Sequence, residues 1–272
     1  MKKIFLIYVI SLFLFTSCAT LNISHPGIGR IKRYEFAHKD VPESFDGFKI
    51  AFISDLHYKS LFTEKRLFHL VKTIDSLHPD VLLMGGDYQE DCAVVPQLFD
   101  ALATIKTKYG IVGVMGNNDY ERCHDEIVRE MKKHEMKVLE HQLDTLNVNG
   151  ERLILAGVRN PFDLKQNGIS PTSTLSDKDF VILLTHTPDY AEEVSIPHTD
   201  LVLAGHTHGG QVTFFGLYAP VIPSVYGQRF RTGLKYTSAG VPVIITNGLG
   251  TSRKRIRLFA PSEVVLITLR RK

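Results

Sequence analysis

The sequence has few cysteines and little excess charge of either sign. Its three cysteines in 272 residues form no cluster, which excludes a structural zinc site built from thiolates. The formal net charge is only +3, whereas nucleic-acid binding normally calls for a clustered basic face, so no nucleic-acid partner is expected. With 44% hydrophobic and 22% charged residues and no low-complexity tract, the composition is that of a folded globular protein.

The N-terminus has the layout of a signal peptide. Two lysines precede an apolar run, Ile4 to Phe15, which is shorter than the roughly 20 residues of a membrane-spanning helix. The stretch that ends at Cys18 also resembles a bacterial lipobox, with phenylalanine in place of the usual leucine at position 15. We therefore expect an exported lipoprotein that is held at a membrane surface through Cys18. Plain secretion and an uncleaved N-terminal anchor are the alternatives.

The rest of the chain is expected to form one domain. Residues 1–18 are assigned to the leader, residues 19–46 to a tether and a lead-in strand, and residues 47–272 to a single α/β domain. Export implies an oxidising compartment, in which Cys92 and Cys123 could pair. Because sequence gives no Cα separation for these two residues, the expectation is two free thiols.

Short apolar runs alternate with polar clusters along the domain. Each run is typical of a buried strand, and the cluster after it carries carboxylate, amide or imidazole groups. In open α/β sheets, ligands bind where the carboxyl ends of several strands converge. The five pairs of run and cluster are Lys49–Ile53 before Ser54 to His57, Val81–Met84 before Gly85 to Asp87, Ile111–Met115 before Gly116 to Asp119, Phe180–Leu184 before Thr185 to Pro188, and Leu201–Ala204 before Gly205 to Gln211.

Amphipathic helices are expected between the first of these strands. One begins after Thr63, a candidate N-cap, and stops before Pro79. Strand–helix–strand order predicts parallel pairing in the first half, and the turn-rich part after Gly210, with strands at Val241–Thr246 and Val264–Leu269, predicts a second sheet. The apolar positions of the three helices are Leu67, Leu70, Val71, Ile74 and Leu77, then Leu98, Leu102 and Ile105, then Ile127, Val128 and Met131.

The side chains of the polar clusters have the chemistry of metal ligands. Asp, Asn and His together supply oxygen and imidazole donors, which suit borderline divalent ions such as Mn²⁺, Fe²⁺ or Zn²⁺. Other histidines lie outside the clusters and are expected on helix faces or in loops. These are His69, His78, His134, His141 and His198.

Taken in order, the clusters resemble the motifs of the calcineurin-like metallophosphoesterases, which are D-x-H, G-D, G-N-H-D/E, a lone H and G-H-x-H. The stretch from Gly205 to Gln211, together with Asn247-Gly248-Leu249-Gly250, is similar to the YkuE/YaeI-like branch, which contains membrane-associated phosphodiesterases. The motifs read here Asp55-Leu56-His57, Gly86-Asp87, Gly116-Asn117-Asn118-Asp119, His186 and Gly205-His206-Thr207-His208.

This resemblance implies a fold and a reaction. The fold would be α/β, a layered α/β/β/α sandwich of two mixed sheets. The reaction would be metal-dependent hydrolysis of a phosphodiester or pyrophosphate bond. A lipid-linked substrate is one candidate, because enzymes of that branch cleave the pyrophosphate of UDP-2,3-diacylglucosamine.

The resemblance also implies a site for two divalent metal ions. Asp87 would bridge them, because two cations about 3.5–4 Å apart need a shared anionic ligand to offset their repulsion. The nucleophile would be a hydroxide that bridges the two ions, rather than a side chain. The remaining ligands would be Asp55, His57 and His208 for one ion, and Asn117, His186 and His206 for the other.

Asn118 departs from the family pattern, which has histidine at this catalytic position. Its amide can donate a hydrogen bond but supplies no proton, so poor leaving groups would suffer most. We therefore predict a preference for pyrophosphates or activated diesters. A broad phosphomonoesterase and a catalytically weak metal-binding envelope protein are the alternatives.

Several residues near the motifs keep two interpretations. Asp119 could orient a ligand or cap a helix. Tyr58 and Tyr120 could reach the substrate or pack at the rim of the site. A basic set could bind phosphate or acidic lipid head groups, or form a solvated face. This set comprises Arg229, Arg231, Arg253, Lys254, Arg255 and Arg257.

Overall fold

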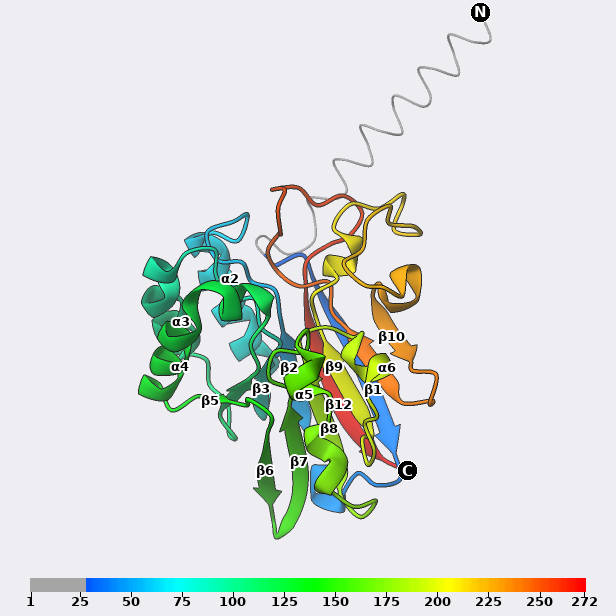
Figure 1. Cartoon of the computed structure of the whole chain (residues 1–272). Coiled ribbons are helices and arrows are strands. Elements are labelled where there is room, and N and C mark those ends of the chain that lie inside the picture. The colour runs from blue at the N-terminus through cyan, green and yellow to red at the C-terminus, as the bar shows by residue number, and fades with distance from the viewer. Residues whose placement is uncertain (1–27) are drawn as a thin grey trace, which may run out of the picture.

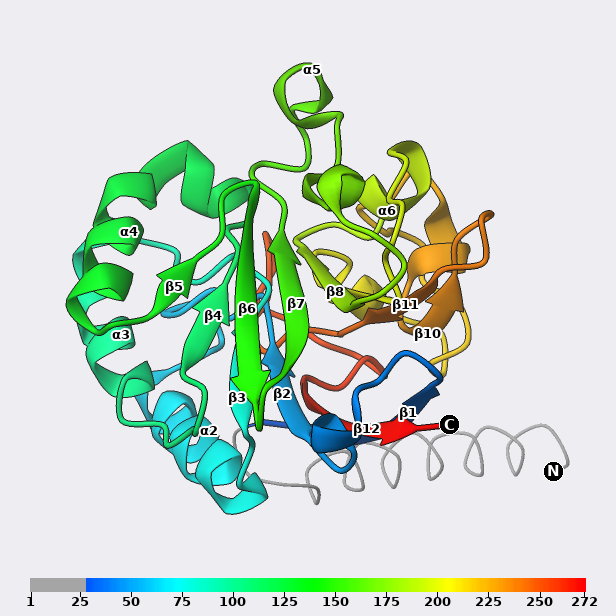
Figure 2. The ribbon, with the colours of Figure 1, turned by 90° about the horizontal axis from the view of Figure 1, so that it is seen from below.

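The computed structural model describes residues 28–272 and places two mixed β-sheets face to face, with helices on the outer sides (Figures 1 and 2). The leader, and with it Cys18, lies outside the described residues. Within them, no helix combines the length and the apolar character needed to cross a membrane.

The first sheet has the strand order β1-β12-β2-β3-β4-β5. Strands β2 to β5 are parallel, whereas β12 runs antiparallel to β2 and parallel to β1. The parallel pairing expected for the first half is therefore confirmed. The bounds are β1 Arg30–His38, β12 Glu263–Arg271, β2 Lys49–Ile53, β3 Val81–Met84, β4 Ile111–Gly113 and β5 Lys137–Val138.

The second sheet has the order β10-β11-β9-β8-β7-β6. Strands β7, β8, β9 and β11 are parallel neighbours, and the two edge strands β6 and β10 are antiparallel to them. The bounds are β10 Gly233–Tyr236, β11 Pro242–Ile245, β9 Leu201–Ala204, β8 Phe180–Thr185, β7 Glu151–Gly157 and β6 Gln142–Val148.

Three buried apolar clusters fill the spaces between the layers. Along β2, Ile50 and Phe52 point into the space between the sheets, while Ala51 and Ile53 point toward the helices, as strand alternation requires. A third cluster lies on the outer face of the second sheet and includes Tyr190. The expected α/β/β/α sandwich is confirmed.

The three expected helices are present on the outer face of the first sheet. The side chain of Thr63 accepts a hydrogen bond from the Arg66 N–H (3.4 Å), and the helix ends at His78 in a left-handed conformation, before Pro79. Ile105 is buried but lies beyond the end of the second helix. The helices are α2 Glu64–Leu77, α3 Val95–Leu102, α4 His124–Lys133, α5 Leu164–Asn167 and α6 Tyr190–Glu193, with a π-helix at Asp119–Cys123 and 3-10 turns at Glu43–Phe45, Cys92–Val94, Pro171–Thr174, His208–Gly210 and Gly227–Phe230.

Two expectations about sheet membership are wrong. The second sheet begins at β6, well before Gly210, and the strand that contains Val264–Leu269 belongs to the first sheet. The last strand returns to pair between β1 and β2. A local apolar pattern indicates that a segment is a strand but carries no information about its partner.

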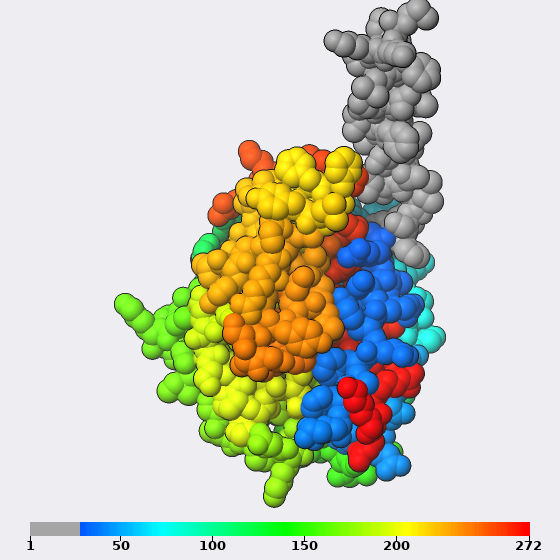
Figure 3. Space-filling view, turned by 90° about the vertical axis from the view of Figure 1, so that its right-hand side faces the viewer, coloured from blue at the N-terminus to red at the C-terminus, as the bar shows by residue number. Residues whose placement is uncertain are grey.

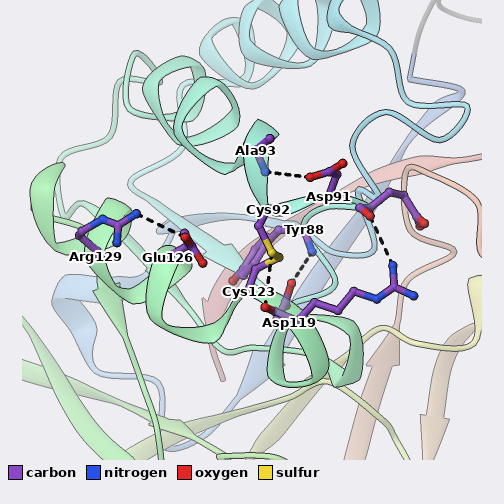
Figure 4. The surroundings of a disulfide bond; sticks show 10 residues. Tyr88, Asp91, Cys92, Ala93, Asp119, Cys123, Glu126 and Arg129 are labelled. Carbon is purple, nitrogen blue, oxygen red and sulfur yellow. Dashed lines mark hydrogen bonds and ion pairs between the residues drawn. A yellow bond between two sulfur atoms is a disulfide. The ribbon is translucent and has the colours of Figure 1, made fainter.

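The expectation of free thiols at Cys92 and Cys123 is also wrong. The two residues form a disulfide with Cα atoms 5.4 Å apart (Figure 4). Strands β3 and β4 are parallel neighbours, so the segments that follow them leave the same edge of the sheet and meet. The bond therefore joins the segment after Asp87 to the π-helix after Asn118.

Candidate metal centre

The polar clusters of both sheets meet at the carboxyl ends of their strands. The imidazole rings of His57, after β2, and His208, after β9, have centroids 5.0 Å apart. The backbone N–H of His206 donates to both carboxylate oxygens of Asp55, at 2.9 and 3.2 Å. Residues that follow strands of the first sheet and residues that follow strands of the second sheet thus form one site.

Asp87 lies between two groups of ligand-type side chains. Its Oδ2 atom is 3.4 Å from His57 Nε2 and 3.5 Å from His186 Nε2. On the first side, His208 Nε2 lies 3.3 Å from Asp55 Oδ1. On the second side, His206 Nδ1 lies 3.2 Å from His186 Nε2. One carboxylate oxygen is therefore close to a histidine of each group.

Several proposed ligands have strained backbone conformations, which could not be predicted from the sequence motifs. Left-handed φ angles are uncommon for residues other than glycine and cluster at functional sites. Such angles occur at five of the proposed ligands, namely Asp55 (51°), His57 (41°), Asp87 (54°), His206 (67°) and His208 (52°).

Glycines in the motifs permit a close approach of backbone to carboxylate. A Cβ atom on Gly116 would lie 2.1 Å from Asp87 Oδ1, and one on Gly205 would lie 2.4 Å from Asp55 Oδ2. Both distances are too short for real contacts, so neither position tolerates a side chain without displacing a proposed ligand.

Two buried atoms at the site have no hydrogen-bond partner among residues 28–272. They are His57 Nε2 and Asn117 Oδ1. Buried polar atoms are nearly always paired, so such orphans call for a partner such as an ion. Both belong to proposed ligands, and a nitrogen lone pair and an amide oxygen are suitable donors to a divalent metal. The residues present therefore fit a metal site.

Burial and mutual charge set the protonation of the site. Burial disfavours ionisation of Asp87, but the attraction and hydrogen bond of His186 outweigh it, and the pKa of Asp87 falls well below its usual range. Burial and the neighbouring histidine His186 lower the pKa of His206 to about 3. Burial likewise lowers the pKa of His208. Burial opposes protonation of His186, but the charge and hydrogen bond of Asp87 raise its pKa to about 10, so His186 would have to lose a proton when a metal binds.

Three surrounding groups hold the proposed histidine ligands in position. Glu90 Oε1 lies 2.6 Å from His57 Nδ1, and the backbone carbonyl of Gly85 lies 2.7 Å from His186 Nδ1. The guanidinium of Arg257 lies 3.3 Å from His208 Nδ1 and donates to the His208 carbonyl at 3.1 Å. Acceptors such as the Glu90 carboxylate and the Gly85 carbonyl orient metal-binding histidines, whereas Arg257 can only donate and holds His208 through its backbone carbonyl.

Asp119 supports the loops rather than capping a helix. Its carboxylate accepts hydrogen bonds from the backbone N–H groups of Asp87 (2.7 Å), Tyr88 (3.0 Å) and Gly116 (2.9 Å). Burial and the charge of Asp87 raise its pKa to about 7. Asp119 therefore ties the segment after β3 to the segment after β4, and Figure 4 shows this link beside the disulfide.

Asn118 lies at the site with its amide toward His57. Its Nδ2 atom is 3.2 Å from His57 Nδ1, and its backbone N–H donates to Asp87 Oδ1 at 3.0 Å. The two tyrosines do not share this position. Tyr58 is completely buried, and the hydroxyl of Tyr120 donates to Glu140 at 3.2 Å.

The basic set divides into structural and exposed members. Arg257 also donates to the carbonyls of Gly250 (2.8 Å), Asn247 (2.6 Å) and Ala260 (3.1 Å). Arg231 donates to backbone carbonyls, and Arg229 pairs with Glu192 at 2.9 Å. Arg229 is nevertheless exposed, as are Arg253, Lys254 and Arg255.

Sequence reasoning missed three residues at or around the centre. Glu90 lies three positions after Asp87, in the same polar cluster. Its carboxylate is the feature by which the sequence could have identified it as a residue of the site. Arg257 was recognised only as one of a basic set. Phe162 carried no signal, yet its half-exposed ring lies 5.0 Å from the ring of His206, between centroids.

The chain is similar in sequence to known proteins of one family. Residues 48–210 match the family model described as calcineurin-like phosphoesterase. The chain is 30% identical to the uncharacterized metallophosphoesterase YkuE of Bacillus subtilis over 239 residues, covering 85% of this chain and 82% of the relative. It is 27% identical to an uncharacterized metallophosphoesterase of Aquifex aeolicus, covering 89% and 92% of the two chains. The crystal structure of TT1561 from Thermus thermophilus aligns with a TM-score of 0.49 and 15% identity, over 74% of this chain and 90% of that one.

Proposed function

Because this chain belongs to the calcineurin-like phosphoesterase family and is therefore a metallophosphoesterase, we propose that it hydrolyses a phosphodiester or pyrophosphate bond with two divalent metal ions. The observation that carries this proposal is the position of Asp87, whose Oδ2 atom lies 3.4 Å from His57 Nε2 and 3.5 Å from His186 Nε2. One carboxylate is thus within reach of both proposed ligand groups.

The proposed ligands divide into two sets around that carboxylate. Asp55, His57 and His208 would hold one ion, and Asn117, His186 and His206 the other. When bound, two such ions lower the pKa of a water molecule toward neutrality and polarise the oxygens of the phosphoryl group. The protein's own part is to fix ligand directions, which Glu90 does for His57 at 2.6 Å.

Asn118 supports a preference for good leaving groups. Its amide can donate a hydrogen bond to a phosphoryl oxygen, but it holds no proton that could pass to a departing alkoxide. General acid catalysis is commonly worth about 10²–10⁴-fold, so an ester whose leaving group needs no protonation loses least. A nucleotide phosphate or a phenol is such a leaving group.

The setting we propose is a bacterial membrane surface. The N-terminal sequence that ends at Cys18 supports export and lipid anchoring, and the disulfide between Cys92 and Cys123 is consistent with an oxidising compartment. A lipid-linked pyrophosphate such as UDP-2,3-diacylglucosamine fits both this setting and the leaving-group preference.

A substrate panel tests the proposal. Purified protein loaded with Mn²⁺, Fe²⁺ or Zn²⁺ is assayed on bis(nitrophenyl) phosphate, nitrophenyl phosphate, an alkyl diester and UDP-2,3-diacylglucosamine. We expect turnover of the nitrophenyl diester and of the pyrophosphate, and little turnover of the alkyl diester. Faster turnover of the monoester would identify a phosphomonoesterase instead. Bound metal without turnover of any ester would favour the metal-binding envelope protein, to which the replacement of histidine by Asn118 also points.

A further inference from the structure

Exposed apolar side chains gather in two loops at one end of the molecule. Among the described residues 28–272, eight of the fourteen large hydrophobic side chains that are exposed lie in residues 214–225 and 256–258. Single exposed hydrophobic residues are normal, but a contiguous group marks an interaction surface. We call the two loops that carry them, residues 214–225 and 252–258, the crest, and its exposed apolar members are Phe214, Phe215, Leu217, Tyr218, Val221, Val225, Ile256 and Leu258.

The two loops of the crest are joined to each other. The backbone N–H of Thr213 donates to the Leu258 carbonyl at 2.9 Å, and the rings of Phe215 and Phe259 lie 5.2 Å apart. The side chain of Gln211 donates to the carbonyls of two residues in the second loop, at 2.9 and 3.1 Å. The exposed side chains are therefore presented by one connected unit.

The crest also carries positive charge without acidic residues nearby in the chain. Arg253, Lys254 and Arg255 are exposed and directly precede Ile256. Within the described part of the chain, their side chains make no hydrogen bond or ion pair. From Leu201 to Ser262 the sequence contains no Asp or Glu. Asp189 touches the end of the first loop, where its carboxylate accepts hydrogen bonds from Ser224 and the Val225 N–H. A basic, acid-free segment with apolar side chains is complementary to an anionic lipid surface.

The crest lies at the same end as the metal centre. Its first loop follows His208, and Arg257 joins the second loop to His208 through the 3.1 Å hydrogen bond to its carbonyl. Both loops lie at the upper end of the molecule, one coloured yellow and the other orange-red, and the yellow one projects in the space-filling view (Figures 1 and 3).

The start of the described chain lies at this end as well. The backbone N–H of Arg30 donates to the Ser262 carbonyl at 2.9 Å, so the chain enters β1 beside the second loop. Cys18, the proposed point of lipid attachment, precedes Ile28 by ten residues, which an extended chain spans in at most roughly 33–36 Å. That span is the upper limit on the distance between Ile28 and an anchor at Cys18.

We propose that the crest is a membrane-docking surface, whose apolar side chains enter the head-group region of a bilayer while its three exposed basic side chains contact anionic lipids. Docking through the crest holds the metal centre next to the bilayer. This inference rests on the contacts above and not on the proposed reaction, but it explains how a lipid-linked substrate would reach the site.

The absence of tryptophan from the chain allows a direct test. The full-length Phe215→Trp variant is mixed with vesicles of phosphatidylcholine, with or without phosphatidylglycerol. Ile169→Trp is the matched control, because Ile169 is similarly exposed (76%, against 72% for Phe215) and lies outside the crest. The emission reports contact at the crest itself, and the Ile169→Trp control reports any change that an anchor at Cys18 would produce alone.

We expect the Phe215→Trp emission to shift to shorter wavelength with the anionic vesicles, and brominated lipid to quench it. The Ile169→Trp emission should not change. Adding Arg253→Glu and Arg255→Glu to the Phe215→Trp protein should abolish the shift. No shift with anionic vesicles, or an equal shift in the control, would overturn the proposal. A shift that depends on protein concentration alone would also overturn it, because such a shift indicates self-association. Turnover of bis(nitrophenyl) phosphate by the same proteins reports the metal centre separately, so failure of the reaction and failure of docking are distinguishable.

Discussion

Glu90 Oε1 lies 2.6 Å from His57 Nδ1, which leaves the other ring nitrogen of His57 directed at Asp87 Oδ2, 3.4 Å away. A carboxylate on the outer nitrogen of a metal-binding histidine fixes its tautomer and orientation, and loss of such a partner typically costs about 10–100-fold in metal affinity or activity. We therefore expect Glu90→Gln to weaken metal binding by about that factor, measured by competition with a chelator.

Asp91→Asn is the matched control for this change. Asp91 is the next residue and accepts a hydrogen bond from the Ala93 N–H at 2.9 Å, without touching a proposed ligand. Equal metal affinity of Glu90→Gln and wild type would show that Glu90 does not orient His57.

Asn118→His should restore a group that can protonate the leaving oxygen. Because Asn118 Nδ2 lies 3.2 Å from His57 Nδ1, the position is at the site. Turnover of an alkyl diester should rise by about 10²–10⁴-fold, while turnover of a nitrophenyl diester changes little. The measurement is the ratio of kcat/KM for the two esters. A rise by the same factor for both would contradict a role in protonation.

The disulfide between Cys92 and Cys123 should contribute substantially to stability. It closes a segment of sequence separation 31, for which the chain-entropy model gives about 3–4 kcal/mol. Reduction should therefore lower the free energy of unfolding by about this amount in denaturant titrations. The double variant Cys92→Ser with Cys123→Ser serves as the control, since reductant should leave its stability unchanged. Stability that is unaffected by reduction of the wild type would refute this prediction.

Arg257 should be needed for the integrity of the loops beside His208. Its guanidinium donates to the carbonyls of Gly250, Asn247 and His208 at 2.6–3.1 Å. Arg257→Lys keeps the charge but cannot make these hydrogen bonds together, so we expect a loss of about 2–3 kcal/mol in unfolding free energy. Arg253→Lys, at an exposed position of the same loop, should have no measurable effect. Equal stability of the two variants would argue against a structural role for Arg257.

The sequence predicts the local elements better than their partners. The Lys49–Ile53 and Val81–Met84 runs coincide with β2 and β3, and Thr63 caps α2 as expected, because strand composition and helix capping are local properties. The pairing of Val264–Leu269 with the first sheet depends on contacts more than 200 residues apart in sequence, which no local pattern encodes.

The same limit applies to the candidate site. The proposed ligands stood out because each follows a strand, and the family resemblance, together with the repulsion between two cations, singled out Asp87. Glu90, Arg257 and Phe162 act through contacts with residues from other segments, and the disulfide required the Cα separation of 5.4 Å, so these features needed the structure.

The most direct test is the metal content and turnover of wild type and Asp87→Asn, measured together on protein reconstituted with Mn²⁺, Fe²⁺ or Zn²⁺. An asparagine has nearly the same shape as Asp87 but no charge, so it cannot offset the repulsion between two cations. We predict two ions per chain and turnover of bis(nitrophenyl) phosphate for the wild type, and loss of at least one ion together with that turnover for Asp87→Asn. Equal metal content and equal turnover in the two proteins would contradict the account.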